Sequence, residues 1–435
     1  MHKHKQRNKM SVSLKQHIRG CRAKGMAPRR FKVIVELCKP ASGGCLKKLR
    51  SSMAGSGRRF RIRRKLEIIG SVAAEVHASC LSKLLRHSSV KRVHHDTKLR
   101  TRLNIATPSI GSTLLQRRGL TGRGVTIGII DTGVYPHPDL VKPVNRIVGF
   151  RDFLGGRCHP YDDNGHGTHV AGDAAGNGRS SRGKYTGPSP KARLVVAKAF
   201  NRFGEGDTSD VIAAIDWIVR TRHKFGTRIV NMSFGGPPGG SCEEDPLCRA
   251  VGRAWDRGLI VVASAGNEGP GARTIDSPGI NPKIITVGAT DDLRTLKQTD
   301  DQVAPFSSRG PAPDRKTKPD LVAPGVDIVS LRAPGSFLDR REPFNRVANS
   351  YFRMSGTSMS TPIVAGAIAQ LLQRFPRLTN EQVKSLLRRS AIRLRKGGPN
   401  VQGSGEVSLF GFAAAKPIPR CRPSRQAVKK TVASR

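Results

Sequence analysis

The chain has 435 residues, 37% of them apolar, so it is long enough to bury the cores of two or three domains. Lys and Arg total 77 against 31 Asp and Glu, and the formal net charge of +46 excludes an ordinary charge-balanced protein. No apolar run reaches the ~20 residues of a membrane span, which argues against an integral membrane protein. Because the basic N-terminal region shows no apolar core of a secretory signal, we expect a cytoplasmic or unconventionally exported protein.

The excess positive charge is concentrated near the N-terminus. Residues 1–110 carry 28 Lys and Arg but only four Asp and Glu, whereas residues 111–379 carry 36 and 25. We therefore predict a separate small unit at 30–105 and a globular body at 106–415. The basic ends at 1–29 and 416–435 lack apolar periodicity and are predicted to be flexible tails.

The small unit has alternating strand and helix patterns. Strands are predicted at Arg30–Leu37, Leu66–Val76 and Val90–Leu99, and helices at Gly44–Met53 and Ala78–His87. The polar stretch at 100–111, which contains Pro108, shows neither pattern and is the expected boundary. These features predict a small α/β unit of about seventy residues.

From Gly122 onward, apolar strands alternate with helical patterns. Strands are predicted at Val125–Ile130, Leu194–Phe200, Ile229–Phe234, Ile260–Ala265 and Ile284–Val287. Helices are predicted at His169–Ala175, Asp210–Arg220 with Ser209 as N-cap, Leu247–Arg257 with Pro246 in its first turn, Ser358–Phe375 and Glu381–Arg389. This alternation indicates an α/β fold with one parallel sheet covered by helices on both faces.

The cysteines form no C-x-x-C pair, so zinc or thioredoxin-like chemistry has little support. Free thiols in a reducing compartment are the simpler interpretation, and Cys242 with Cys248 is the one local pair worth testing as a disulfide. The eight are Cys21, Cys38, Cys45, Cys80, Cys158, Cys242, Cys248 and Cys421.

Three reactive side chains lie at the carboxyl ends of predicted strands or in the segments that follow, where parallel α/β sheets place their functional groups. Asp131 ends an apolar strand, His166 lies between two glycines before a helix, and Ser358 begins a long helix. Each alone has a structural explanation: a turn former, a surface histidine, an N-cap serine. Together they supply a hydroxyl nucleophile, an imidazole base and a carboxylate that orients the base.

A fourth residue fits the same chemistry. Asn267 follows a predicted strand, between Gly266 and Glu268. Alone it is explained as a turn residue, but its side-chain amide there can donate to the oxyanion of a tetrahedral intermediate.

The chain resembles the subtilase family of serine proteases across residues 120–412. The motifs that carry the resemblance are GIIDTG around Asp131, HGTHVAG from His166, NMSFGG from Asn231, AGNEG around Asn267, SSRGP from Ser307 and GTSMSTP around Ser358. The segments YPHPDL, ARTIDSPGI and TKPDLVAPG are similar to the AprX-type bacterial subtilases, regarded as intracellular. The resemblance implies a subtilisin-like fold and a serine endopeptidase in which Asp131 orients, His166 transfers protons, Ser358 attacks and Asn267 stabilises the oxyanion.

The resemblance also implies where a substrate binds. The segment Ser233-Phe234-Gly235 would pair with an extended substrate, and Gly204-Glu205-Gly206 would form the opposite rail. Ser264–Gly266 and Phe234 would wall the pocket for the residue before the scissile bond. Small groups there suggest an open slot for large apolar side chains, whereas Glu268 at the rim would tolerate a basic one, and the sequence does not rank the two.

The N-terminal unit resembles the ferredoxin-like subtilase propeptide, which assists folding and then inhibits. We therefore expect a zymogen that cuts itself once between Asp96 and Gly111. No metal site is expected: many family members bind calcium and Asp139 matches one ligand position, but the loop Gly176–Gly187 has no acidic residue. His169, the second histidine of HGTHVAG, is expected to pack in the helix.

Two other functions remain as alternatives. A nucleic-acid-binding protein is suggested by the charge, but the basic ends have few aromatic residues and no recognition motif, so only non-specific contact is expected. A catalytically inactive subtilase is disfavoured because all four catalytic positions hold the required residue types. The expected partners are polypeptide substrates and the chain's own propeptide, without a membrane and without a cofactor.

Overall fold

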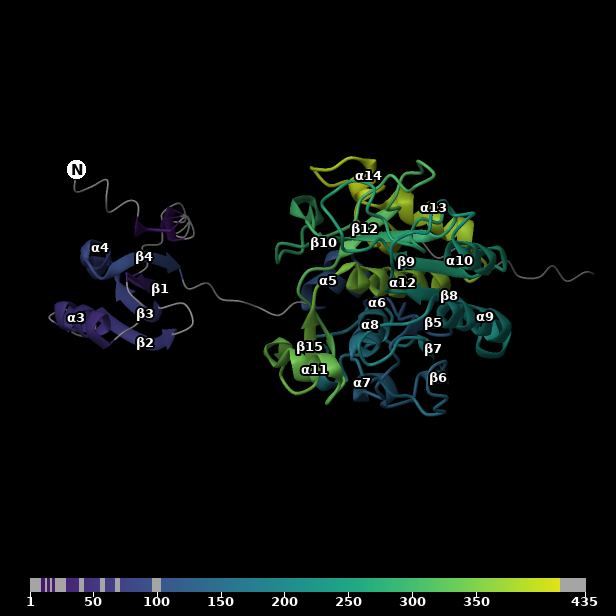
Figure 1. Ribbon diagram of the computed structural model, residues 1–435, viewed down its shortest axis with the longest axis horizontal. Helices are drawn as coiled ribbons and strands as arrows, with labels where there is room; N and C mark the ends of the chain where they lie inside the picture. The colour runs from purple at the N-terminus through teal and green to yellow at the C-terminus, as the bar shows by residue number, and fades with distance from the viewer. Residues whose placement is uncertain are drawn as a thin grey trace, which may run out of the picture. The chain divides into compact units, whose positions relative to one another are not determined.

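The computed structural model describes residues 9–11, 14–15, 18–19, 29–38, 43–54, 59–66, 71–95 and 103–414. The chain divides into two compact units, Met1–Arg100 and Thr101–Arg435, and many of their elements are labelled in Figure 1. The predicted tail at 416–435 lies outside the described residues. Within the described part of the chain, every helix is too short or too polar to cross a membrane.

The small unit contains a four-stranded antiparallel sheet and the helices α3 and α4. Its elements are β1 (Arg30–Leu37), α3 (Gly43–Ala54), β2 (Phe60–Leu66), β3 (Ser71–His77), α4 (Ala78–Arg86) and β4 (Val90–His95). The strands lie in the order β2-β3-β1-β4, and the βαββαβ chain order is that of ferredoxin-like folds. Alternation along β1 buries Phe31, Val33 and Val35 in one cluster with Leu49 of α3 and Leu84 of α4.

Two predictions for this unit are wrong. The strand predicted at Leu66–Val76 is divided between the end of β2 and β3, and β2 was missed because its basic sequence FRIRRKL weakens the apolar signal. The tail predicted through residue 29 is wrong at two described positions. Met10 pairs with Val93 of β4, and Leu14 is fully buried in the small unit's core.

The body contains the predicted parallel sheet, in the order β11-β10-β9-β8-β5-β7-β6 with β12 beside β10. Only β11 runs antiparallel. The strands are β5 (Thr126–Asp131), β6 (Ile147–Asp152), β7 (Arg193–Lys198), β8 (Thr227–Met232), β9 (Ile260–Ser264), β10 (Ile285–Asp291), β11 (Gln302–Val303) and β12 (Leu321–Pro324). The sequence signal missed β6, a half-exposed edge strand, and β12, which is short and ends in proline.

A second, three-stranded sheet joins segments that the sequence left unassigned. It consists of β13 (Ile328–Leu331), β15 (Tyr351–Met354) and β14 (Arg346–Val347), in that order. Its strands are short, and β14 has only two residues, so no periodic pattern marks them.

The longer helices of the body were predicted to within a few residues. The helices are α5 (Leu103–Ser109), α6 (Ser112–Arg117), α7 (Pro138–Val141), α8 (His166–Ala175), α9 (Thr208–Phe225), α10 (Pro246–Asp256), α11 (Phe337–Arg341), α12 (Thr357–Arg374), α13 (Asn380–Ser390), α14 (Pro399–Gln402) and α15 (Phe410–Ala414). Short 3₁₀ turns lie at Arg179–Ser181, Gln298–Asp300 and Pro343–Asn345. The predicted N-cap of α9 is wrong, because Asp207 and not Ser209 precedes its first residue.

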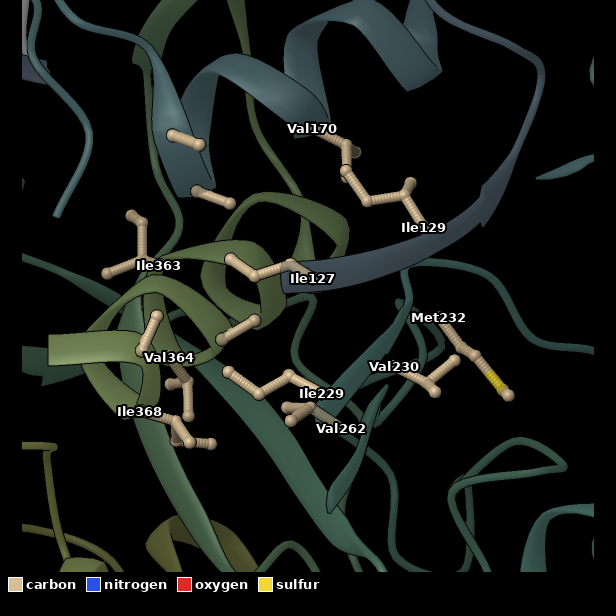
Figure 2. Close-up of a cluster of buried hydrophobic side chains, with 14 of the residues drawn as sticks. Ile127, Ile129, Val170, Ile229, Val230, Met232, Val262, Ile363, Val364 and Ile368 are labelled. Carbon is tan, nitrogen blue, oxygen red and sulfur yellow. The ribbon is translucent and has the colours of Figure 1, made fainter. Parts of the chain in front are cut away.

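Helices cover both faces of the central sheet, as β5 illustrates. Ile127 and Ile129 project toward the side chains of α12 and α8 (Figure 2). Gly128 faces the other way, and a Cβ added there would lie 3.2 Å from Cδ1 of Ile218 on α9. A strand buried on both sides explains the continuous apolar run that predicted it.

The stretch after residue 100 differs from its prediction. We expected no regular structure up to residue 111, but Leu103–Ser109 forms α5. Ala106 and Ile110 are fully buried in the core of the body, and the Thr107 hydroxyl donates to the Thr186 carbonyl at 2.8 Å. Tertiary packing therefore stabilises a helix that the sequence did not predict, because Pro108 and the polar composition obscure the helical pattern.

Cys242 and Cys248 form a disulfide that closes the loop entering α10, so the expectation of free thiols is wrong for this pair. Cys38, Cys45, Cys80 and Cys158 are free. Cys21 and Cys421 lie outside the described residues.

Candidate active site

Asp131 and His166 meet at the edge of the sheet where the parallel strands end. Asp131 is the buried last residue of β5, and His166 is the first residue of α8. The Nδ1 atom of His166 lies 2.8 Å from Oδ1 of Asp131, which also accepts a hydrogen bond from the Thr132 amide at 2.7 Å. The predicted carboxylate–imidazole pair is thus in contact.

The loop that presents His166 is held by Asp162, a residue to which the sequence assigned no role. Its Oδ1 accepts from the amide of Gly165 at 2.8 Å, and its Oδ2 accepts from the amide of Thr168 at 2.8 Å. The Thr132 hydroxyl donates to the same carboxylate at 2.9 Å. Asp162 therefore fastens the end of β5 to the start of α8 and fixes the imidazole relative to Asp131.

The surroundings of His166 stabilise the protonated imidazole ring more than bulk water would. Burial disfavours the charged imidazolium, but the charge and hydrogen bond of Asp131, together with the charges of Asp162 and Asp173, outweigh it, so the pKa of His166 is raised above its usual value of 6.5. When Nδ1 donates to Asp131, the neutral ring carries its lone pair on Nε2. The side chain is 21% exposed, so the ring can reach a bound molecule.

Ser358 is the second residue of α12, and the N-cap of that helix is Gly356, so an N-cap role does not explain the serine. Its hydroxyl donates to the Ser233 carbonyl at 2.7 Å. Within the described part of the chain, no hydrogen bond joins Ser358 to His166. The hydroxyl thus rests on the strand-end segment that was expected to bind substrate.

Asn267 is anchored at the N-terminus of α12. Its Oδ1 accepts from the Thr357 amide at 2.9 Å and from the Thr357 hydroxyl at 3.1 Å, which leaves Nδ2 as the donor. A Cβ built on Gly356 would lie 3.6 Å from Nδ2 of Asn267 and 3.7 Å from the Ser358 amide nitrogen. Two N–H donors therefore border one small space beside Ser358, at the positive end of an 18-residue helix.

Most of the expected substrate-binding residues line two adjoining cavities. One of about 280 Å³ contains Gly204, Ser233 and Phe234 together with Asp131 and His166. Leu338 and Met354 also line it, and they come from the segment around the three-stranded sheet, where no sequence pattern had predicted an element or a site residue.

The second cavity, of about 320 Å³, contains Gly206, Phe234 and Gly235. The aromatic rings of Phe200 and Phe234 contact each other with centroids 4.7 Å apart and belong to both cavities. Glu205 is exposed, and its backbone is held by Asn201.

The remaining expected residues join these walls to the helix. The Ser264 hydroxyl donates to the Phe234 carbonyl at 3.0 Å. The Thr357 hydroxyl contacts the Gly266 carbonyl at 3.3 Å. The ends of β8 and β9 are thereby held beside the first turn of α12.

The residues around Asp139 do not fit a calcium ion. Oδ1 of Asp139 accepts from the Ser180 amide at 2.8 Å, and Oδ2 accepts from the Tyr351 hydroxyl at 2.7 Å. The guanidinium of Arg146 donates to the Asp139 carbonyl. Oxygen atoms that already accept hydrogen bonds, next to the buried guanidinium of Arg146, do not provide the six to eight ligands that calcium requires.

His169 lies inside α8 and is fully buried. Its Nδ1 contacts Asp173 at 2.9 Å, and its Nε2 lies 3.1 Å from the Phe352 carbonyl. It therefore packs the helix against neighbouring segments and is absent from the cavity lining around His166.

The sequence profile described as the subtilase family matches residues 122–413. The chain belongs to the subtilase family. It is a subtilisin-like serine endopeptidase, a hydrolase, since several similar proteins carry protease names.

Two relatives and one solved structure illustrate the likeness. "Serine protease AprX" of Bacillus subtilis is 44% identical over 81% of this chain and 80% of that protein. "Subtilisin DY" of Bacillus licheniformis is 34% identical over 70% of this chain and 97% of that protein. The structure of "Sphericase" has a TM-score of 0.54 and 30% identity, covering 66% of this chain and 92% of that one.

Proposed function

We propose that the chain hydrolyses peptide bonds through an Asp131–His166–Ser358 triad and an acyl-enzyme intermediate. The observation that carries the proposal is the 2.8 Å contact between Asp131 and Nδ1 of His166, in a cavity that is also lined by Ser233, the residue whose carbonyl accepts from the Ser358 hydroxyl. Nε2 of His166 takes the Ser358 proton as Oγ bonds to the scissile carbonyl carbon, then gives that proton to the leaving amine. Water, deprotonated by the same nitrogen, cleaves the ester and restores the serine.

The resting contact of Ser358 suggests how the substrate engages it. The Ser358 hydroxyl donates to the Ser233 carbonyl, an acceptor on the segment expected to pair with an extended substrate. A substrate amide that bonds this carbonyl competes with the hydroxyl, which is then released to turn toward His166. Substrate binding is in this way linked to activation of the Ser358 hydroxyl.

The developing oxyanion has two donors nearby, Nδ2 of Asn267 and the amide of Ser358. Because Thr357 holds the amide oxygen of Asn267, the nitrogen is oriented before substrate arrives. Pre-oriented donors act on charge that exists only in the transition state, which raises kcat more than affinity.

We also propose that the protein is made as a self-processing zymogen. Supporting this are the separate N-terminal unit, its βαββαβ order and its strong positive charge. The basic unit would be attracted to acidic groups at the active-site cleft. The described residues of the unit form their own buried core, as a domain that acts as an inhibitor requires.

A fluorophosphonate probe tests the central proposal. Wild-type protein is expected to be labelled at Ser358, and Ser358→Ala should lose both labelling and peptide hydrolysis, the latter by about 10⁶ in kcat. Ser355→Ala, an exposed serine three residues earlier, is the matched control and should keep both. Hydrolysis by the Ser358→Ala protein above a few thousandths of the wild-type rate would contradict the triad.

A further inference from the structure

The carboxyl group of Asp276 lies between the two backbone segments that wall the pocket next to Ser358. A Cβ added to Gly235 would lie 3.0 Å from Oδ2 of Asp276, and one added to Gly266 would lie 2.5 Å from the same atom. The first segment includes Ser233, whose carbonyl accepts from Ser358. The carboxyl group therefore lies against both segments, and the first of them also accepts the hydrogen bond of the nucleophile.

The backbone around Asp276 is fixed to both walls. The amide of Asp276 donates to the Ala265 carbonyl at 2.9 Å. Ser277 and Gly236 exchange two hydrogen bonds, of 2.9 and 3.1 Å. With its chain held on both sides, Asp276 keeps its carboxyl group at a defined place between the segments.

This carboxyl group is partly buried yet receives no hydrogen bond and forms no ion pair with any described residue. Burial raises the pKa of Asp276 to about 6, and the negative charge of Glu268 adds to the effect. Burying a carboxylate without a partner costs free energy, and the like charge of the neighbouring Glu268 increases that cost. A cation placed at this carboxylate would remove that cost.

We infer that Asp276 makes this pocket selective for a Lys or Arg side chain at the substrate residue before the scissile bond. The inference rests on the proposed peptidase function and extends it to a substrate class. A guanidinium or ammonium group at Asp276 supplies the absent charge, whereas a large apolar side chain would bury the carboxylate further. Asp276, to which the sequence analysis assigned no role, thus decides between the apolar and basic side chains that were both expected to fit this pocket.

Peptides that differ only at this residue test the inference. At pH 8, where Asp276 is ionised, wild-type enzyme is expected to show a kcat/KM for Arg and Lys peptides at least tenfold above that for the Met peptide. Asp276→Asn keeps the side-chain shape and removes the charge, so the Arg-to-Met ratio should fall by about 30-fold or more. Asp216→Asn, an exposed acid on α9, is the matched control and should leave the ratio unchanged.

A second measurement uses the wild-type protein alone. The Arg-to-Met ratio should fall as the pH drops through about 6, because Asp276 becomes protonated. Protonation of His166 affects both peptides equally and cancels in the ratio, and the negative charge that acts on Asp276 is that of Glu268. Equal or better cleavage of the Met peptide at pH 8, or an unchanged ratio in Asp276→Asn, would overturn the inference. Failure of every peptide together with an unlabelled Ser358 would instead overturn the peptidase function on which it rests.

Discussion

The 2.8 Å contact between Nδ1 of His166 and Oδ1 of Asp131 joins the end of β5 to the first turn of α8. The two residues are 35 positions apart in the chain, and Asp162 fastens the connecting loop on both sides. The carboxylate lies at one ring nitrogen, and the ring lines the same cavity as Ser233 and Phe234. The contact sets both the tautomer and the acidity of the proposed base.

The pH dependence of activity should reflect this contact. A general base must be neutral, and the pKa of His166 is raised, so kcat/KM for an uncharged peptide should rise with pH to a plateau with a midpoint above 6.5. NMR titration of His166 in the Ser358→Ala protein measures the same group without self-digestion. A midpoint at or below 6.5 by both methods would contradict the role of Asp131.

Asp131→Asn in that background is the matching variant. Removing the carboxylate charge leaves burial opposed mainly by the charges of Asp162 and Asp173, so the pKa of His166 should fall from its value in the parent protein. An unchanged titration would mean that Asp131 does not set the acidity of the ring.

Loss of the Asn267 amide should affect the chemical step. Asn267→Ala is expected to lower kcat by about 10²–10³ with little change in KM, because Nδ2 acts on charge that develops in the transition state. Asn145→Ala replaces another exposed asparagine, whose side chain accepts from the Ile147 amide, and should keep the wild-type kcat. A raised KM with unchanged kcat would show that Asn267 serves binding alone.

The sequence was most informative where residues repeat a strong pattern. Buried strands such as β5 and β8 and the long helix α12 were placed to within a residue or two because apolar packing dictates their composition. Elements whose stability comes from distant neighbours were missed. The helix α5 depends on packing into the body, and β14 exists only through pairing with β15.

The site shows the same division. Four of the site residues lie inside specific motifs at the ends of strands or the start of a helix, so the sequence alone could predict them. These residues are Asp131, His166, Ser358 and Asn267. Asp276 lies inside a motif that was recognised, but its importance comes from lying beside Gly235 and Gly266, which only the structure reveals. A cytoplasmic location stays a prediction from the sequence.

Arg146 should make the Asp139 region independent of calcium. The Arg146 guanidinium donates to the carbonyls of Asp139, Ala175 and Ala192, which places a buried cation where a metal would otherwise supply charge. A strong chelator is therefore expected to leave the Tm of the Ser358→Ala protein unchanged, whereas Arg146→Met in that background should lower it through unpaired carbonyls. A Tm that falls on chelation, recovers with calcium and loses this response in Asp139→Asn would contradict the proposal.

The self-processing cut should fall before α5. Within the expected range Asp96–Gly111, a substrate must lie extended in the groove, but Leu103–Ser109 is a helix packed into the body, Ile110 is fully buried and Gly111 caps α6. The cut is therefore expected within 96–102, whose sequence DTKLRTR offers Lys98, Arg100 and Arg102 to a pocket beside Asp276. We predict one cut directly after one of these three residues.

N-terminal sequencing and mass measurement of purified protein check this cut. Wild type should appear as two fragments, and Ser358→Ala should keep all 435 residues. The separated N-terminal fragment should inhibit the body until it is degraded, and the inhibition should weaken at high salt because the fragment's positive charge draws it to the acidic groups Glu205, Glu268 and Asp276. Full activity with the original N-terminus intact would remove the propeptide role. A cut inside 103–109 would instead show that α5 unfolds during processing, and an inert fragment would leave the N-terminal unit to some function other than inhibition.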